Sequence, residues 1–361
     1  RRTGVTETDF IRECDAAFKQ GSKFLRWRED RDDDYYHHPF VLPTGYLDTN
    51  LVAGWMAHSD VPFSMLTCFQ SHLCEAGKSP KQFATPEWAS VANYSYHLDA
   101  AKLGVFMRRH CVERLGVRHV SDHMTGVEAH DNGDIAALQT REHGAIAGDL
   151  FVDCSGMRAL LIGQHYGVEI ESQKGVLFND RAIAVQVPYV DPTVEIACQT
   201  LSTAQEAGWI WDIGLQSRRG IGHVYSSTHT SDDDAEAALR RYIVETGGRE
   251  EDIRTLPRIT IKPGFRRGAW HRNCVAIGLA SGFMEPLEAS SLVMVELAAG
   301  MLADQMPATR EAMDIVAKRY NDTFSYRWDR IVDFLKLHYV LSKRDDSDYW
   351  RDNRLPETIP T

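Results

Sequence analysis

The sequence has no long apolar run and no block of basic residues. No stretch approaches the roughly 18 to 20 apolar residues that a membrane-crossing helix needs, and the opening segment RRTGVTETDF carries no apolar signal core. The formal net charge is −11, and Lys and Arg are nowhere dense enough to follow a phosphate backbone. We therefore expect a cytoplasmic protein with neither nucleic acid nor membrane as a partner.

The sequence also lacks closely spaced cysteines. Its seven cysteines are an odd number, none has CxxC spacing, and several lie in apolar runs where a thiol acts as a small hydrophobe. This spacing argues against structural zinc and against a disulfide framework, and we expect no metal site. The cysteines are Cys14, Cys68, Cys74, Cys111, Cys154, Cys198 and Cys274.

What is present is the composition of a globular protein, with 43% apolar and 25% charged residues, long enough for one large or two interleaved domains. Strand-like and helix-like patterns alternate along it, which predicts an α/β fold with an inserted sheet. Asn132-Gly133 between two alternating runs predicts a hairpin. One helix is predicted over 98–111 and a second from Ser231 to a stop at Gly247. A third is predicted to begin at Ser290, and the last segment is predicted to be helical to about Leu341. Strands are predicted in RAIAVQVPY, GWIWDIGL and IGHVYSS.

Two strand-like runs end in glycine turns, VDCSG (152–156) and IGLASGF (277–283). A glycine after a strand is most often a plain turn, but two such turns in an α/β fold favour a dinucleotide site, because they let the backbone approach the ligand. The candidate cofactor contacts are Gly156, Gly278, Ala280, Ser281 and Gly282. The usual GxGxxG fingerprint is absent, and we expect its strand to lie outside the 361 residues.

The second turn leads into MEPLEASS, where Glu285 and Glu288 flank Pro286 just before a helix that Ser290 opens. The first amides of that helix, including those of Ser290 and Ser291, have no partner within the helix and can hold an anion. The alternative for Glu288 is a first-turn acid favoured by the helix dipole. A carboxylate beside anion-accepting amides instead favours a base next to a small ion.

Four segments, GLASGFMEPLEASS, DLFVDCSGMRALLIGQ, TAQEAGWIWDIGL and DAAFKQGSKFLRW, together resemble the flavin-dependent tryptophan halogenase family. The resemblance runs from about Thr6 to Arg354 in family order. It implies an FAD-binding Rossmann-like domain with an interleaved mixed-sheet substrate domain, as in single-component aromatic hydroxylases. The implied domains are FAD-binding 98–165 and 260–305, substrate-binding 1–97 and 166–259, and a C-terminal helical segment 306–361.

The resemblance also implies a chemistry. In that family reduced FAD (FADH2) and oxygen convert a halide ion to hypohalous acid, which reaches a lysine and then halogenates an indole-like ring. The lysine matches Lys19, the assisting glutamate matches Glu288, and the halide-holding amides match Ser290 and Ser291. The resemblance implies a separate flavin reductase as the partner. It leaves open whether the protein forms a homodimer. Without the resemblance, Lys19 would be interpreted as an ordinary exposed lysine.

Aromatic segments complete the implied site. His38 and Phe40 in YYHHPF match the residues that sandwich the indole ring, against the alternative of a loop packing on the core. Trp209 and Trp211 match the family's WxWxIP signature beside the flavin, against the alternative of core packing. Gly214 replaces the proline, which predicts a looser turn, and Ser291 replaces a glycine, which leaves bromide or chloride open, with bromide the more easily oxidised ion.

Two other functions are consistent with the same framework. An FAD-dependent aromatic monooxygenase would not need Lys19, and its activity would not depend on halide. A non-catalytic flavin-binding homologue would bind flavin without forming either product.

Overall fold

The computed structural model describes residues 3–253 and 256–360. Its internal contacts divide the chain into two units, each assembled from segments far apart in the sequence. The first unit comprises Arg1–Arg118, Arg181–Ile259 and Leu341–Asp352, and the second comprises His119–Asp180, Thr260–Val340 and Asn353–Thr361.

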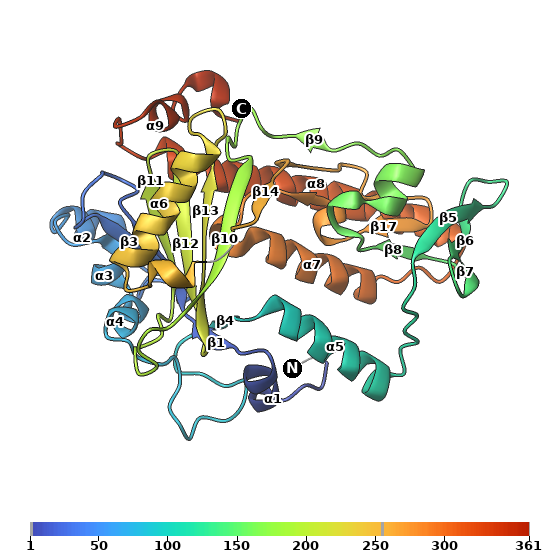
Figure 1. The fold of residues 1–361 in the computed structure, drawn as a ribbon, viewed down its shortest axis with the longest axis horizontal. Helices are drawn as coiled ribbons and strands as arrows, with labels where there is room; N and C mark the ends of the chain where they lie inside the picture. Colours follow the sequence, from blue (N-terminus) through green and yellow to red (C-terminus); the bar gives the residue numbers. More distant parts are fainter. Residues whose placement is uncertain (1–2, 254–255, 361) are drawn as a thin grey trace. The chain divides into compact units, whose positions relative to one another are not determined.

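The first unit is built on a seven-stranded mixed sheet with the order β14-β10-β13-β12-β11-β2-β3 (Figure 1). β2 and β11 run parallel, whereas β2–β3, β11–β12, β12–β13 and β10–β13 are antiparallel. A separate antiparallel pair is formed by β1 (Ala17–Lys19) and β4 (Ser95–His97). The sheet strands are β2 (Gly21–Leu25), β3 (Tyr35–Pro39), β10 (Arg181–Pro188), β11 (Thr200–Gln205), β12 (Gly208–Gly214), β13 (Arg218–Tyr225) and β14 (Arg258–Thr260).

One face of this sheet is covered by α6 (Asp232–Glu245), which crosses the strands in Figure 1. Leu239, Tyr242 and Ile243 of the helix pack on Ile183, Ile210 and other buried apolar residues of the sheet. The remaining helices of the unit are α1 (Glu7–Glu13), α2 (Leu51–Met56), α3 (Phe63–Thr67), α4 (Phe69–Glu75), α5 (Ala100–Leu115) and α9 (Asp348–Asp352), with the short helix η3 (Glu250–Asp252).

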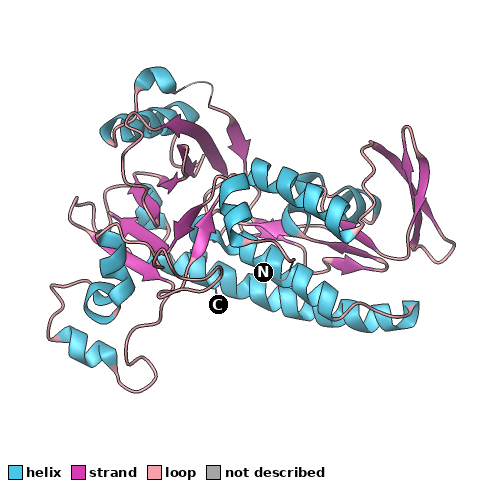
Figure 2. Ribbon diagram, turned by 90° about the horizontal axis from the view of Figure 1, so that it is seen from below, coloured by secondary structure: helices cyan, strands magenta, loops and turns pink. Residues whose placement is uncertain are grey.

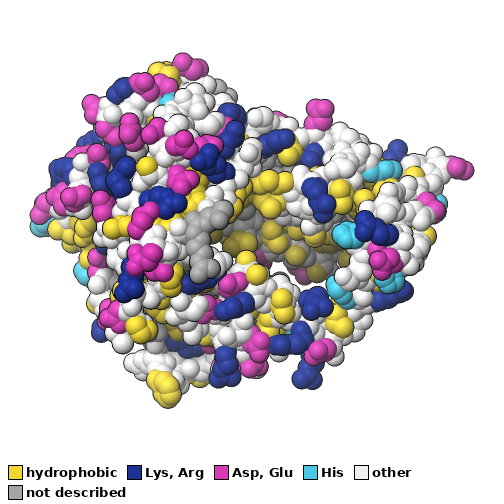
Figure 3. All heavy atoms as spheres, viewed as in Figure 1, with side chains coloured by type: hydrophobic (Ala, Val, Ile, Leu, Met, Phe, Trp, Pro, Cys, Tyr) yellow, Lys and Arg dark blue, Asp and Glu magenta, His cyan; other side chains and the backbone are white. Residues whose placement is uncertain are grey.

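The ends of α6 are those that the sequence predicts. The Ser231 hydroxyl accepts a hydrogen bond from the Asp234 amide, three aspartates occupy the first turn, and Gly247 has a φ of 88°. Figure 3 shows acidic and basic side chains interspersed over this helix. Arg258 and Arg240 pair there with the helix acids, and such exposed pairs contribute little to stability.

The second unit contains three small sheets. Their orders are β5-β6-β7, β16-β17-β8 and β18-β15-β9. The first is antiparallel, and in the second β17 runs parallel to β8, with Ala276 opposite Asp153. The strands are β5 (Met124–Ala129), β6 (Ile135–Thr140), β7 (Gly144–Ala147), β8 (Phe151–Asp153), β9 (Glu171–Ser172), β15 (Gly264–Phe265), β16 (Trp270–His271), β17 (Cys274–Ala276) and β18 (Gly282–Phe283).

Two long helices complete the second unit, α7 (Ser290–Asp304) and α8 (Arg310–Val340). α8 is the long helix that runs across Figure 2, and it contacts both α7 and β16. Its buried residues recur at helical spacing, including Tyr320, Phe324 and Trp328. The short helices are η1 (Gly156–Arg158), η2 (Leu160–His165), η4 (Gly278–Ala280), η5 (Leu287–Ala289) and η6 (Pro356–Thr358).

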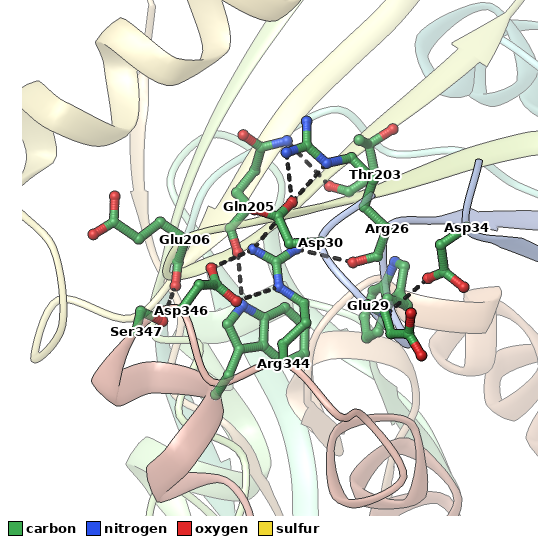
Figure 4. A network of polar contacts seen from close by, with 12 residues as sticks. Arg26, Glu29, Asp30, Asp34, Thr203, Gln205, Glu206, Arg344, Asp346 and Ser347 are labelled. Atoms are coloured by element: carbon green, nitrogen blue, oxygen red, sulfur yellow. Dashed lines mark hydrogen bonds and ion pairs between the residues drawn. The ribbon is translucent and has the colours of Figure 1, made fainter. Parts of the chain in front are cut away.

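The C-terminal segment 341–352 returns to the first unit and is fixed there by polar contacts (Figure 4). The buried Arg344 guanidinium donates to the Arg26 carbonyl at 2.9 Å and to the Asp346 carboxylate at 2.6 Å. Ser347 donates to the carbonyl of Glu206, and the Trp350 indole donates to the carbonyl of Gln205. These bonds join three sequence-distant segments, so this part of the chain completes the first unit.

Most predicted elements are confirmed. The hairpin turns at Asn132-Gly133 between β5 and β6, and α5 covers the predicted helix 98–111, beginning after the Asp99 cap and ending before Gly116. The predicted fold class, α/β with a mixed multi-strand sheet and C-terminal helices, is also confirmed. No helix within residues 3–253 and 256–360 is long and apolar enough to cross a membrane.

The unit boundaries lie at other residues than the domain boundaries implied by the resemblance. The segment 98–165 spans both units, because Phe106 of α5 packs in a cluster with Val5, Cys14 and other residues of the first unit. The structure assigns no function to either unit, so the FAD-binding and substrate-binding domains stay predictions.

Candidate active site

Lys19 is the last residue of β1 and is only 8% exposed. β1 pairs with β4 so that Lys19 lies opposite Ser95. The Lys19 Nζ atom lies 5.9 Å from the centroid of the Phe40 ring, a distance at which the ring face attracts a cation. The alternative of an ordinary exposed lysine is therefore inconsistent with the structure.

His97, at the end of β4, is a neighbour of Lys19 that the sequence did not predict. Burial, together with the positive charge of Lys19, lowers the pKa of His97 to about 3. One imidazole nitrogen lies 2.9 Å from the Thr200 hydroxyl. The His97 ring, whose pKa the Lys19 charge helps to lower, is thus neutral at neutral pH. No sequence motif marks it, because it comes from a distant strand.

His38 and Phe40 lie at the end of β3, on either side of Pro39. The His38 ring lies 4.9 Å from the Phe24 ring and 5.4 Å from the Tyr36 ring, so it belongs to an aromatic cluster. Phe40 instead faces Lys19. The structure therefore brings Phe40 and Lys19 together, and it gives the two flat side chains different neighbours.

Glu288 lies in the second unit, in a turn with unusual backbone geometry. Glu288 has a φ of 59° and Ala289 a φ of 53°, so two consecutive non-glycine residues are left-handed. Each such residue costs about 1–2 kcal/mol relative to the right-handed conformation. A turn of this kind persists only where its surroundings hold it, and such strain is concentrated at functional sites.

Glu285 supplies part of those surroundings. Its carboxylate is 1% exposed and accepts hydrogen bonds from the Asn179 amide at 2.7 Å and from the Tyr339 hydroxyl at 2.8 and 2.9 Å. Burial lowers the pKa of Lys336 to about 8, against the opposing effect of the Glu285 charge. The first acid of MEPLE is therefore a buried structural carboxylate. Asn179 and Tyr339 are two supporting residues that the sequence did not predict.

Ser290 and Ser291 are the first two residues of α7, as predicted. Their backbone amides belong to the first turn of the helix and therefore have no carbonyl acceptor within it. Such amides can donate hydrogen bonds to an anion at the start of the helix. Ser291 does not have a positive φ, because Glu288 and Ala289 make the left-handed turn before it. Serine therefore fits at 291 without the strain that would follow if that position needed glycine.

The hydroxyls of Ser290 and Ser291 are buried, and neither has a hydrogen-bond partner among residues 3–253 and 256–360. Ser291 lines a very small cavity of about 10 Å³, together with Gly278, Ser281, Tyr320 and Trp328. The cavity lies between the two helices that follow the second glycine turn. Its walls are mostly apolar and aromatic, with the serines at positions 281 and 291 among them.

The two glycine turns follow β8 and β17, which are adjacent parallel strands, so both turns lie at the same sheet edge. Gly156 has a φ of 69° and Gly278 a φ of 72°. A Cβ on Gly156 would meet no atom within 4 Å, and one on Gly278 would meet only Val295, at 3.6 Å. Open left-handed glycines at the ends of parallel strands fit the close approach of a dinucleotide such as FAD.

The other residues of the second turn have structural contacts. A Cβ on Gly282 would lie 2.6 Å from Phe265, so glycine is required there by packing of β18 on β15. The carbonyls of Ala280 and Ser281 both accept hydrogen bonds from Arg266. In the first turn the buried Asp153 carboxylate accepts from the amides of Ser155, Leu161 and Ile162 and so fixes the loop after β8.

Trp209 and Trp211 are two residues apart on β12, so their side chains lie on the same face of the sheet, with ring centroids 6.3 Å apart. Trp209 is 1% exposed and lies 6.2 Å from Trp27, within the aromatic core. Trp211 is half-buried and lines an open groove of about 670 Å³ with Val185, Arg218 and Ile221. Core packing thus describes Trp209, whereas Trp211 is accessible to a ligand.

Gly214, which replaces the family's proline, ends β12 opposite Arg219. A Cβ at this position would lie 2.8 Å from Ile196 and 3.1 Å from the Tyr189 hydroxyl. Gly214 is therefore in close contact with the neighbouring loop. The predicted looser turn is not what the structure shows, because Gly214 is tightly packed.

Comparison with known proteins agrees with this arrangement. The family model for tryptophan halogenase matches residues 1–361. The chain belongs to the tryptophan halogenase family. Among similar structures, the tryptophan halogenase of Shewanella frigidimarina NCIMB 400 is 46% identical, with a TM-score of 0.95 over 99% of this chain and 68% of that chain. BrvH, a flavin-dependent halogenase from Brevundimonas sp. BAL3, is 34% identical, with a TM-score of 0.87 over 99% and 71%.

A curated relative, tryptophan 6-halogenase ThaL of Streptomyces albogriseolus, is 34% identical over 97% of this chain and 68% of its own length. Membership of the tryptophan halogenase family confirms the resemblance, the FAD-binding fold class and the status of the protein as a flavin-dependent enzyme. Within this halogenase, Lys19, His38, Phe40, Trp209 and Trp211 belong to the first unit. Glu288, Ser290, Ser291 and the glycine turns belong to the second.

Proposed function

We propose that this protein halogenates an indole-like aromatic ring, with tryptophan as the leading substrate, using reduced FAD, oxygen and bromide or chloride. The observation that carries the proposal is Lys19, a buried lysine beside the Phe40 ring and a neutral histidine. Relatives named as tryptophan 6- and 7-halogenases support the indole ring as the substrate class.

Lys19 has the chemistry to hold and deliver hypohalous acid. Its amine can donate a hydrogen bond to the small reagent, or exchange a proton for the halogen and become a haloamine. Burial keeps water away from the reagent, and the neighbouring His97 ring, neutral at pH 7, adds no second positive charge. Phe40 supplies a flat apolar wall that suits an aromatic substrate.

Glu288 has the chemistry to accept the proton that the ring loses when it becomes aromatic again. Glu288 stands in the left-handed turn two residues before Ser290, the first residue of α7. The amides of Ser290 and Ser291, reinforced by the dipole of the fifteen-residue helix α7, can hold the halide ion. The roles of these residues rest on their family positions together with this local geometry.

Residues such as Gly156 and Gly278 would hold FAD, which when reduced would supply, with oxygen, the oxidising equivalent that converts halide to hypohalous acid. We expect a separate flavin reductase to deliver it. Trp211, which borders the open groove, can shield the flavin side of the site from the substrate ring.

The test combines the full-length protein with FAD, a flavin reductase, NADH and oxygen, and with tryptophan or indole. Parallel reactions contain bromide, chloride or no halide, and products are measured by mass spectrometry. We expect a brominated or chlorinated product only when halide is present. Lys19→Ala should reduce its formation by about 10²-fold or more, and Glu288→Gln on the order of 10²-fold, while flavin oxidation continues.

Lys23→Ala is the matched control, because Lys23 lies nearby on β2 but pairs with Glu75 at 2.8 Å and faces the Tyr35 ring. This variant should keep wild-type halogenation. Full halogenation by Lys19→Ala would overturn the proposal. A halide-independent gain of one oxygen atom would instead identify a monooxygenase, and flavin binding without either product would identify a non-catalytic homologue.

A further inference from the structure

The first unit contains a groove of about 480 Å³, which is lined by α2, α3, the start of α4 and the loop that leads into α2. This volume is within the range of roughly 300–1,000 Å³ that is typical of ligand sites. The three helices lie beside β3 in Figure 1, and α3 and α4 contact that strand. The roles proposed for Lys19 and Phe40 do not account for this groove.

The walls of the groove are apolar, and part of their surface is exposed. The Trp55 indole donates to the Val61 carbonyl at 2.7 Å, and its ring lies edge-on to the Phe63 ring, so this wall is fixed. Leu66 and Phe69 also line the groove and are 46% and 45% exposed. Exposed apolar side chains that gather in a concave surface mark a binding site, whereas scattered ones do not.

The polar groups of the groove are neutral. Among the described residues that line it, none is Asp, Glu, Lys or Arg. Thr44 and Thr49 are exposed there, and within residues 3–253 and 256–360 their hydroxyls bond to no other residue. With the Asn50 side chain they offer hydrogen-bond donors and acceptors without charge. The groove therefore suits an apolar ligand that carries neutral amides, and it offers no counter-ion to a charged one.

The groove begins close to Phe40. Val41, the next residue, donates from its backbone amide to the Gln70 side chain at 2.8 Å. The thiol of Cys68, which lines the groove, donates to the Val41 carbonyl at 3.4 Å. Thr44 is four residues beyond Phe40, and four residues span at most about 14 Å. A ring beside Phe40 and a group in the groove can therefore belong to one extended molecule.

We propose that this groove binds the residues that flank the reacting tryptophan of a short, neutral, apolar peptide. The inference rests on the proposed halogenation at Lys19, and it names the substrate class. A tryptophan within a peptide has its amine and carboxyl groups in amide bonds, whereas free tryptophan carries two charges that the groove does not pair. Hydrogen-bonding side chains at three positions, Thr44, Thr49 and Asn50, match several peptide amides rather than the single amide of an acyl chain.

The first test is isothermal titration calorimetry on the full-length protein without flavin or halide. The probes are free tryptophan, N-octanoyl-tryptophan amide, and an acetylated, amidated peptide of five residues with tryptophan at its centre and leucine on both sides. We expect the peptide to bind at least about 10-fold more tightly than free tryptophan, because its leucines bury apolar surface. The same peptide with lysine in place of both leucines should lose this gain. Equal affinity of the octanoyl compound would overturn the assignment to a peptide.

Variants of the groove locate the binding site. Leu66→Ser and Phe69→Ser should each weaken peptide binding by about 10-fold and leave the affinity for free tryptophan unchanged. Because both side chains are nearly half exposed, neither change should unfold the protein, which circular dichroism checks. Leu47→Ser is the matched control, since Leu47 is 85% exposed nearby but does not line the groove. Unchanged peptide affinity in both groove variants would overturn the proposal, as would equal affinity for free tryptophan and the peptide.

Halogenation assays separate this inference from the proposed function. We expect kcat/KM for the peptide to exceed that for tryptophan by about 10-fold or more, and Leu66→Ser to raise KM for the peptide with kcat unchanged. Peptide binding that depends on Leu66, without halogenation of any indole, would support the groove and contradict the proposed function. Halogenation of free tryptophan without peptide binding would overturn the groove alone.

Discussion

Glu285 illustrates how a single side chain can hold a strained turn. It lies three residues before Glu288, and its carboxylate is bonded to Asn179 and Tyr339. Both neighbours donate to it, so the site is built for an acceptor with two oxygens. Because the strain of Glu288 and Ala289 must be balanced locally, we infer that this bonded carboxylate fixes the approach of the chain to the turn.

Glu285→Gln tests this at the residue scale. The amide group of glutamine would direct a donor at a donor, which leaves one buried group unsatisfied and should lower the free energy of unfolding by about 1–3 kcal/mol. Urea denaturation measures the change. The exposed Glu296→Gln on α7 is the matched control and should stay within about 0.5 kcal/mol of wild type. An equally small effect of Glu285→Gln would show that the Glu285 carboxylate does not stabilise the turn at Glu288.

At the scale of elements, the packing of β12 on β13 depends on the absence of a side chain. A Cβ on Gly222 would lie 2.1 Å from the Trp211 ring and 2.6 Å from the Ile183 carbonyl. The Trp211 ring therefore lies flat across β13 in space that only glycine leaves open. Gly222 thereby fixes the orientation of the tryptophan that borders the groove.

Gly222→Ala should lower the free energy of unfolding by about 1–3 kcal/mol, because the ring and a backbone carbonyl must both shift. Gly220→Ala on the same strand is the control, since its Cβ would meet no atom closer than 3.5 Å. Urea denaturation, followed by tryptophan fluorescence, compares the two variants with wild type. Equal stability of the two variants would show that the Trp211 ring is free to move.

At the scale of the whole molecule, burial of ionisable groups makes stability depend on pH. Burial alone would raise the pKa of Glu7, but hydrogen bonds from Lys81, Tyr94, Tyr96 and the Trp88 amide lower it to about 2. The pKa of His97 is lowered from its usual 6.5 to about 3. In both cases the unfolded chain binds protons more readily than the folded one, so folding is progressively disfavoured as the pH falls.

The windows differ for the two groups. The contribution of His97 is complete above pH 6.5 and is lost by up to about 1.4 kcal/mol per pH unit as the pH falls toward 3. Glu7 adds a second loss below pH 4.5. We expect the difference in unfolding free energy between wild type and His97→Gln to be constant from pH 8 to 6.5 and to shrink below that. A constant difference down to pH 5 would contradict the buried, neutral imidazole.

The sequence by itself determined the elements whose signals are local. Asn132-Gly133 specified the hairpin because the turn places Gly133 at a φ of 84°, which glycine adopts without strain. Ser231 and Gly247 specified the ends of α6, because caps act within one turn of a helix. Ser290 is the first residue of α7, as predicted, but Ala289 is the N-cap of that helix. The motif around Lys19 and Glu288 likewise identified the family, since it is contained in short segments.

Only the tertiary structure decided which residues surround those motifs. The partners of Glu285 come from residue 179 and residue 339, and His97 comes from β4, the strand that pairs with the Lys19 strand β1. The division into two units also departs from the segments implied by the sequence, because α5 packs on α1. Contacts between distant segments depend on how strands and helices pack, and no local pattern of residues records that choice.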